Sequence, residues 1–268
     1  ISSKDIADRI GSYQNVSRSL QGAIPGLTVT FSDGKPTRGA SFQVRGANSI
    51  GAGGSALILV DGVETDITTV NSEDIESISV LKDASSTAVY GSRGTFGLIT
   101  TKRPEKGQMK ITYNGSYNFY KRTVTPELVD NGYDWTTSYL EAYTNSYATD
   151  PTNINNVFRF SRAWYSELER RNSDPSYEKW RINPADNRYE YFGNTNWYKI
   201  FYKDYTTGHQ HNLSITGGTD KASYYVSGRF FHQDGIYNAG DERYNQYNVL
   251  AKGTVQATKW LRVENTTS

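Results

Sequence analysis

The chain has 268 residues with 29 basic and 28 acidic side chains, no cysteine and 36 aromatic residues (21 Tyr, 10 Phe and 5 Trp). The near-zero net charge provides no field that attracts a polyanion, so nucleic acid is not an expected partner. The absence of cysteine excludes a disulfide scaffold, a thiolate zinc site and a cysteine nucleophile. No apolar run approaches the ~20 residues of a membrane-spanning helix, although alternating strands could still cross a bilayer.

The first part of the chain, residues 1–106, predicts a small α+β domain. A short helix is expected over 16–23, where Asn15 supplies an N-cap. Asp83 can cap a second helix that ends at Tyr90. Alternating or apolar runs between glycine- and proline-rich turns predict five strands, over 27–31, 41–45, 56–60, 75–81 and 97–101.

The second part, residues 107–268, carries 31 of the 36 aromatic residues and every tryptophan. Apolar and polar side chains alternate along five predicted strands, over 110–121, 211–217, 222–233, 247–257 and 260–268. Most of these runs approach or exceed ten residues, longer than the ~5–6 of soluble sheets and close to the ~9–11 that cross a bilayer. The strands stop inside an alternating pattern, so the chain is interpreted as a piece of a longer one.

A soluble antiparallel sandwich alternates as well and is the alternative to a transmembrane barrel. The connections favour the barrel. Tight turns at 219–221 and 258–259 alternate with long links at 122–208 and 234–243, and short turns on one side with long loops on the other are typical of outer-membrane barrels.

The link over 122–208 is too long for a bare connection, and its spacing predicts helices over 135–147 and 156–171. Trp164, Trp180 and Trp197 could stack on the flat faces of sugars. The alternative is that they pack a small core of the loop itself.

Other chemistry is weakly supported. His209 and His211 share one strand face and could hold a metal, but no third ligand is near in sequence, so no metal or cofactor is expected. The Asp74/Glu76 pair is typical of a solvated turn. No phosphate-binding loop or nucleophile elbow is present, and nothing supports an enzyme.

Several motifs resemble the plug domain of TonB-dependent outer-membrane transporters. They are Leu20–Val29, Val44-Arg45-Gly46, Leu59–Val63 and Asp74–Ser85, and the stretch Ala88–Lys102 resembles the SusC/RagA branch. Residues 211–235 resemble that branch's second and third barrel strands. The resemblance implies an α+β plug domain, residues 1–106, inside a transmembrane antiparallel β-barrel of about 22 strands. Residues 107–268 would begin the barrel, with a long extracellular loop at about 122–208.

The resemblance implies an importer of oligosaccharides or peptides in the outer membrane of a Gram-negative bacterium of the Bacteroidetes. Its plug would gate the barrel, and TonB would supply energy through a segment upstream of Ile1. A SusD-like surface lipoprotein would form a lid, and a homodimer of SusC–SusD pairs is compatible with the family. The outer strand faces would contact membrane lipid. The runner-up is a non-transporting surface β-protein that binds glycans through the aromatic loop.

Two sets of residues are predicted to act in gating and ligand contact. Arg45 and Arg93 each sit beside glycine in a matched motif, so we expect them to pair with wall carboxylates and hold the closed plug. Loops at the outer tip of the plug would face incoming substrate and contribute Asp33, Lys35, Arg38, Glu64 and Asp66. Ordinary surface residues are the alternative in both cases.

Overall fold

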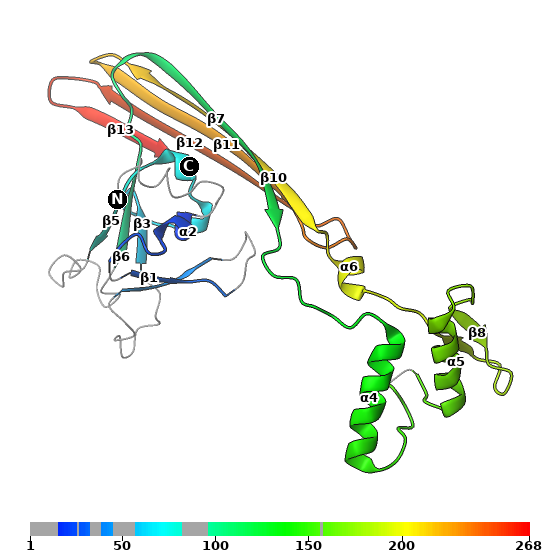
Figure 1. Cartoon of the computed structure of the whole chain (residues 1–268). Coiled ribbons are helices and arrows are strands. Elements are labelled where there is room, and N and C mark those ends of the chain that lie inside the picture. The colour runs from blue at the N-terminus through cyan, green and yellow to red at the C-terminus, as the bar shows by residue number, and fades with distance from the viewer. Residues whose placement is uncertain (1–15, 26, 33–38, 45–56, 82–95, 156–157) are drawn as a thin grey trace. The chain divides into compact units, whose positions relative to one another are not determined.

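The structure, a computed structural model, describes residues 16–25, 27–32, 39–44, 57–81, 96–155 and 158–268 (Figure 1). The chain divides into two compact units. The first joins residues 1–120, 206–235 and 241–268, and the second joins residues 121–205 with 236–240. The first unit therefore contains both the small domain and the long strands that the sequence predicts.

The small domain is built around a four-stranded sheet with the order β4-β3-β6-β5. Its strands are β3 (Leu57–Val60), β4 (Val63–Glu64), β5 (Ile75–Leu81) and β6 (Phe96–Thr101). The strands β3 and β6 run parallel, and the other pairs are antiparallel. A separate hairpin joins β1 (Leu27–Thr30) to β2 (Ser41–Val44). The short helices are α2 (Val16–Leu20), η1 (Ile67–Thr69) and η2 (Ser72–Asp74).

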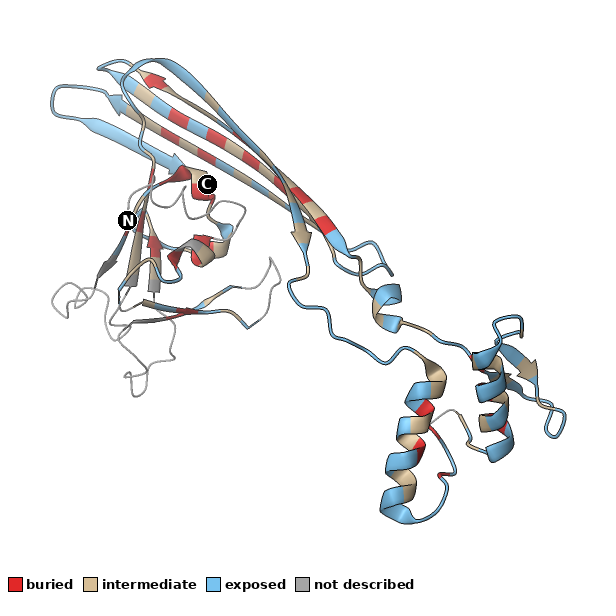
Figure 2. Cartoon of the chain, viewed as in Figure 1, coloured by how far each residue is buried: buried red, intermediate tan, exposed pale blue. Residues whose placement is uncertain are grey.

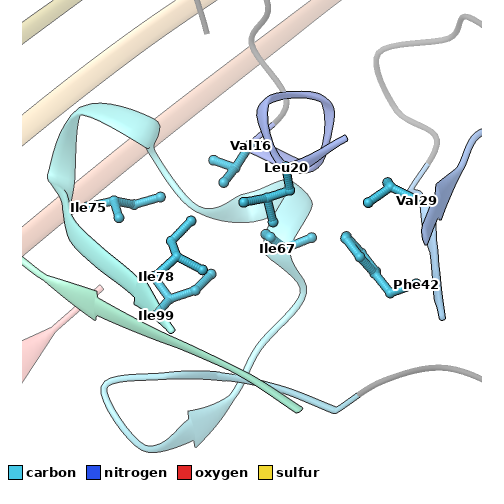
Figure 3. Packing of buried hydrophobic residues seen from close by; sticks show 8 residues of the cluster. All are labelled: Val16, Leu20, Val29, Phe42, Ile67, Ile75, Ile78 and Ile99. Atoms are coloured by element: carbon cyan, nitrogen blue, oxygen red, sulfur yellow. The ribbon is translucent and has the colours of Figure 1, made fainter. Parts of the chain in front are cut away.

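One apolar core ties these pieces together. Side chains from α2, the β1–β2 hairpin, η1 and the sheet meet in it (Figure 3). Its buried members are Val16, Leu20, Val29, Phe42, Ile67, Ile75, Ile78 and Ile99. Burial of a large aliphatic side chain stabilises a fold by about 1.5–3 kcal/mol, so this core can hold the small domain as a unit.

A five-stranded sheet forms the rest of the first unit, in the order β13-β12-β11-β10-β7. Its strands are β7 (Gly107–Lys121), β10 (Tyr205–Gly218), β11 (Ala222–Asp234), β12 (Arg243–Gln256) and β13 (Arg262–Thr267). The registered pairs from β10 to β13 are all antiparallel. Four of the five strands have 13–15 residues, as the alternating runs predict.

Burial alternates along β11 and along much of β10 and β12 (Figure 2), whereas β13 is exposed throughout. The outer face, which points away from the small domain, is apolar and exposed; Tyr247 and Val249 are 73% and 66% accessible. The inner face carries most of the buried polar side chains, Asn212, Ser227, Arg229 and Lys252, beside the buried Tyr225, Phe231 and Leu250. An apolar outer face beside a polar inner face is the pattern of a lipid-facing barrel wall.

The second unit contains helices α4 (Gly132–Tyr147), α5 (Arg162–Ser173) and α6 (Trp197–Phe201) and a hairpin of β8 (Trp180–Ile182) and β9 (Tyr189–Tyr191). Its core consists of Ile154, Trp164, Leu168 and Phe192. Glu167 of α5 forms ion pairs with Arg171 on the same helix and with Arg181 of β8. None of the helices in the described segments combines the length and the apolar character needed to cross a membrane.

Capping explains where the helices of this unit begin. The helix predicted over 135–147 already begins at Gly132, because the side chain of Asn131 accepts hydrogen bonds from the first N–H groups. The helix predicted over 156–171 begins only at Arg162, where Ser161 is the cap. The helix predicted over 83–90 lies outside the described residues.

Candidate functional site

The small domain is seated on the inner face of the five-stranded sheet by hydrogen bonds. One cluster surrounds Asp74 at the end of η2. Asn71 Nδ2 donates to Asp74 Oδ2 and to Asn212 Oδ1 of β10, each at 2.9 Å. The hydroxyl of Tyr225 on β11 donates to Asp74 Oδ1 at 2.8 Å. All four residues are buried, so both oxygens of this carboxylate are engaged away from solvent, while Glu76 is exposed.

A second cluster joins the ends of β3 and β6 to β12. Asp61 lies in the turn after β3 and accepts hydrogen bonds from the N–H and the hydroxyl of Thr101, at 3.0 and 2.5 Å. Lys252 Nζ of β12 lies 3.0 Å from Asp61 Oδ2 and donates to the carbonyl of Thr101 at 3.2 Å. The side chain of Lys252 is only 8% exposed, so its charge is neutralised inside the contact.

The electrostatics of Asp61 follow from these neighbours. Burial raises the pKa of this carboxyl, but hydrogen bonds from Thr101 and Lys252 and the charge of Lys252 outweigh it, so the pKa lies below its usual value. A carboxyl with a depressed pKa stabilises the folded state above its unfolded pKa, about 3.9, and loses that contribution as pH falls through the folded value.

Acidification should weaken the contacts of Asp61 and lower the stability of the protein. The thermal midpoint of the intact protein in detergent should fall on acidification below about pH 4. The fall should be smaller in Asp61→Asn, because that side chain has no charge to lose. Differential scanning calorimetry of both proteins between pH 7 and pH 3 measures the difference. Identical pH profiles for the two proteins would contradict the assignment.

Further hydrogen bonds extend the contact between the small domain and the sheet, hereafter called the seat, along β12. Gln246 Nε2 donates to the carbonyl of Thr68 at 3.2 Å, and Asn248 Nδ2 donates to the carbonyl of Thr69 at 2.5 Å. A cavity of about 270 Å³ lies between β12, β13 and the small domain. The described contact therefore combines many hydrogen bonds with apolar residues around the cavity, such as Val60, Val70 and Leu250.

Arg229 is a buried cation on the same inner face. It donates from Nη2 to Gln210 Oε1 at 3.1 Å and lies over the ring of Phe231. Its Nε and Nη1 have no hydrogen-bond partner among the described residues.

Most of the residues predicted for gating and ligand contact in the small domain are not described. Arg45, Arg93, Asp33, Lys35 and Arg38 lie outside the described residues. Glu64 lies in β4, where it pairs in register with Leu59. Asp66 caps η1 by accepting a hydrogen bond from the N–H of Thr68 at 2.9 Å. Both carboxylate residues are exposed.

The predicted tryptophans surround one cavity of about 640 Å³ in the second unit. Trp164 is buried at its floor and stacks on Phe192 with ring centroids 5.9 Å apart. Trp180 and Trp197 line it with 46% and 61% of their surfaces exposed. Trp135 of α4 also lines this cavity, but it was not among the residues predicted to contact a ligand. Its position in a predicted helix of the same loop could have indicated it.

The lining of this cavity combines indole faces with a few polar groups. Asp130, Asn131, Lys179 and Thr195 lie among the aromatic residues. Its volume is within the ~300–1,000 Å³ of sites that hold small ligands. Exposed aromatic rings around such a cavity can stack on flat apolar surfaces of a ligand.

The known proteins whose sequences are similar to this chain are TonB-dependent receptors. Residues 1–98 match the family model of the TonB-dependent receptor plug domain. TonB-dependent receptor P3 of Formosa agariphila is 32% identical over 94% of this chain and 21% of its own length. TonB-dependent receptor SusC of Bacteroides thetaiotaomicron is 41% identical over 41% of this chain and 12% of its own length.

Solved structures give the same result. The RagAB peptide transporter matches 99% of this chain and 29% of its own chain, with a TM-score of 0.74 and 26% identity. The siderophore receptor PirA from Acinetobacter baumannii, at 15% identity and a TM-score of 0.53, shares the fold. The chain spans about a fifth of the length of TonB-dependent receptor P3.

Proposed function

Since this chain belongs to the SusC/RagA-like TonB-dependent receptors, of which it forms the N-terminal portion with plug and first barrel strands, we propose that it gates active import across the outer membrane. The small domain is the plug, and the five-stranded sheet is hereafter called the wall. The observation that carries the proposal is the polar seat of the plug on the inner face of a wall whose outer face is apolar.

The polar seat suits a plug that must close a wide barrel and still come loose. A typical hydrogen bond contributes only about 0.5–1.5 kcal/mol net, because water replaces the lost partner. TonB would pull on the plug from the periplasm and break these contacts a few at a time. Arg45 and Arg93 would add further contacts to wall carboxylates, as their motif positions suggest.

We propose oligosaccharides or peptides as the imported substrates. Trp180 and Trp197 would stack on the substrate at the rim of the aromatic cavity, and Trp164 would support them from its floor. Asp33, Lys35, Arg38, Glu64 and Asp66 would contact it at the plug. RagAB, to which this chain is similar, is a peptide importer, so peptides are the first substrates to assay.

The proposed partners follow from the family. A SusD-like lipoprotein would cover the extracellular side, and TonB would contact a segment that precedes the plug. A homodimer of such pairs is part of the proposal. The proposed location is the outer membrane of a Gram-negative bacterium of the Bacteroidetes.

Growth and uptake in one bacterial strain test both import and the role of the aromatic cavity. A strain that lacks the intact gene should fail to grow on one defined glycan or peptide, and the wild-type gene should restore growth only when TonB is present. Trp180→Ala with Trp197→Ala should raise the half-saturating substrate concentration by roughly tenfold or more, since each stacking contact contributes about 0.5–1.5 kcal/mol. Uptake of labelled substrate against concentration measures the change.

Trp260→Ala is the matched control, because Trp260 is 83% exposed and lies between β12 and β13, away from the cavity residues in sequence. It should leave uptake unchanged. Substrate binding at the cell surface without TonB-dependent accumulation would favour the non-transporting glycan-binding protein. Equal uptake by the double variant and the control would remove the cavity from the proposal.

A further inference from the structure

Lys252 is the point at which one wall side chain holds two strands of the plug at once. Its ammonium lies 3.0 Å from Asp61 Oδ2, beyond the end of β3, and 3.2 Å from the carbonyl oxygen of Thr101, the last residue of β6. Because β3 and β6 are parallel neighbours, their carboxyl ends meet at the same edge of the plug sheet. A single cation therefore bridges this edge to β12.

The turn after β3 places the side chain of Asp61 beside Thr101 and Lys252. Asp61 and Gly62 have φ angles of 49° and 89°, and they connect the paired residues Val60 and Val63. Two successive left-handed residues form the type I′ turn that favours Asp-Gly. The N–H of Asp61 donates to the carbonyl of Ile99 at 2.9 Å, so both the backbone and the side chain of Asp61 are fixed against β6.

Two described ion pairs connect residues 16–106 to the wall, and they differ sharply in burial. Lys106 and Asp220 lie 3.0 Å apart, but their side chains are 67% and 93% exposed. The side chains of Lys252 and Asp61 are 8% and 24% exposed. An exposed pair contributes little because solvent screens it, whereas loss of one partner of a buried pair leaves a buried charge without compensation.

The chain path adds to the importance of this bridge. From Thr101 the chain runs through 102–106 into β7, so the end of β6 is covalently continuous with the wall. The turn at Asp61 is joined to the same place by side-chain contacts, those with Thr101 and Lys252. A plug that withdraws from the wall must break the contact between Asp61 and Lys252.

We propose that Lys252 is the latch residue of the closed plug, acting through its partly buried ion pair with Asp61 and its hydrogen bond to the end of β6. This inference rests on the proposed gating function. One lysine on β12, the fourth strand of the wall in chain order, rather than the whole set of contacts between plug and wall, sets how often the plug opens without TonB.

The experiment measures ion conductance of the purified full-length receptor in planar bilayers without TonB. Lys252→Met keeps the length of the side chain and removes the charge. It should raise the open probability by roughly tenfold or more, the factor expected when a hydrogen bond to a charged group is lost. Asp61→Asn should also raise the open probability. If Lys252→Met fails to fold, the open probability of Asp61→Asn tests the proposal instead.

Two matched variants separate a latch from a general loss of charge or stability. Lys252→Arg keeps the cation and should stay nearly as closed as the wild type. Lys106→Met removes the exposed pair and should not change conductance. The proposal is overturned if Lys252→Met and Asp61→Asn stay closed, or if Lys106→Met leaks as much as Lys252→Met.

Conductance is read with salt alone, so its outcome does not depend on the substrate. A receptor that imports neither glycans nor peptides could still show the latch. Conversely, a receptor that imports its substrate but stays closed in both latch variants would retain the proposed function and lose this inference.

Discussion

Replacement of Trp164 by alanine is expected to lower the free energy of unfolding of the second unit by about 3–5 kcal/mol. The side chain is 7% exposed and packs with Leu168 and Phe192 in the unit's small buried core. Removal of the indole leaves a cavity that so few neighbours cannot fill. Because the same ring forms the floor of the aromatic cavity, proteolytic sensitivity of this unit and loss of substrate uptake should appear together.

Protease digestion of the intact receptor, followed by mass spectrometry of cleavage sites within 121–205, measures this effect. Trp164→Phe should retain most of the stability, since a large ring still fills the space. Trp260→Ala should change the unfolding free energy by no more than about 0.5 kcal/mol, the range of surface substitutions. A Trp164→Ala protein as resistant as the Trp260→Ala protein would show that the core does not depend on this ring.

Replacement of Ile78 by alanine is expected to lower the free energy of unfolding of the plug by about 2–5 kcal/mol. Ile78 is 2% exposed in the centre of β5 and shares the plug core with Ile75 and Ile99 (Figure 3). The lost methyl groups leave an internal void that the surrounding β-strands cannot close. Hydrogen exchange of the plug amides in the intact receptor measures the change.

Ile78→Val is the matched conservative variant and should cost about 0.5–1.5 kcal/mol. The exchange of wall amides should be unaffected in both variants, because Ile78 belongs to the plug core. Equal protection of the plug in Ile78→Ala and wild type would contradict the assignment of this core.

The plug is held in two physically different ways. Its interior is apolar and depends on burial, whereas its described contact with the wall includes several hydrogen bonds and one partly buried ion pair. Because water can replace the partners of a polar contact but not those of an apolar core, we expect the plug to leave the wall more readily than its core opens.

The plug motifs and the strand alternation predicted most of the fold. The runs at 110–121 and 222–233 alternate with period two, and the structure places β7 and β11 there. Helices α4 and α5 begin at other residues than the sequence predicted. Their first residues are set by Asn131 and Ser161, whose side chains accept hydrogen bonds from N–H groups of the first turn. Such shifts depend on short-range geometry that periodicity alone does not resolve.

The residues that form the contact between plug and wall could not be predicted from the sequence. Lys252 lies on the polar face of an alternating strand, a position shared by many solvated residues, and Asp61 belongs to an ordinary Asp-Gly turn. The pair is separated by 191 positions (252 minus 61). The sequence reasoning instead favoured Arg45 and Arg93, which stay predictions.

The amino-acid sequence by itself determined the family, the strand pattern and the placement of aromatic residues, because these depend on local motifs and on side-chain alternation. Only the tertiary structure decided which polar groups meet across the contact between plug and wall. Asp61, Thr101 and Lys252 come together because parallel β3 and β6 end at one edge and β12 passes beside it. Likewise, four tryptophans from separate elements converge on one cavity only after the second unit folds around its small core.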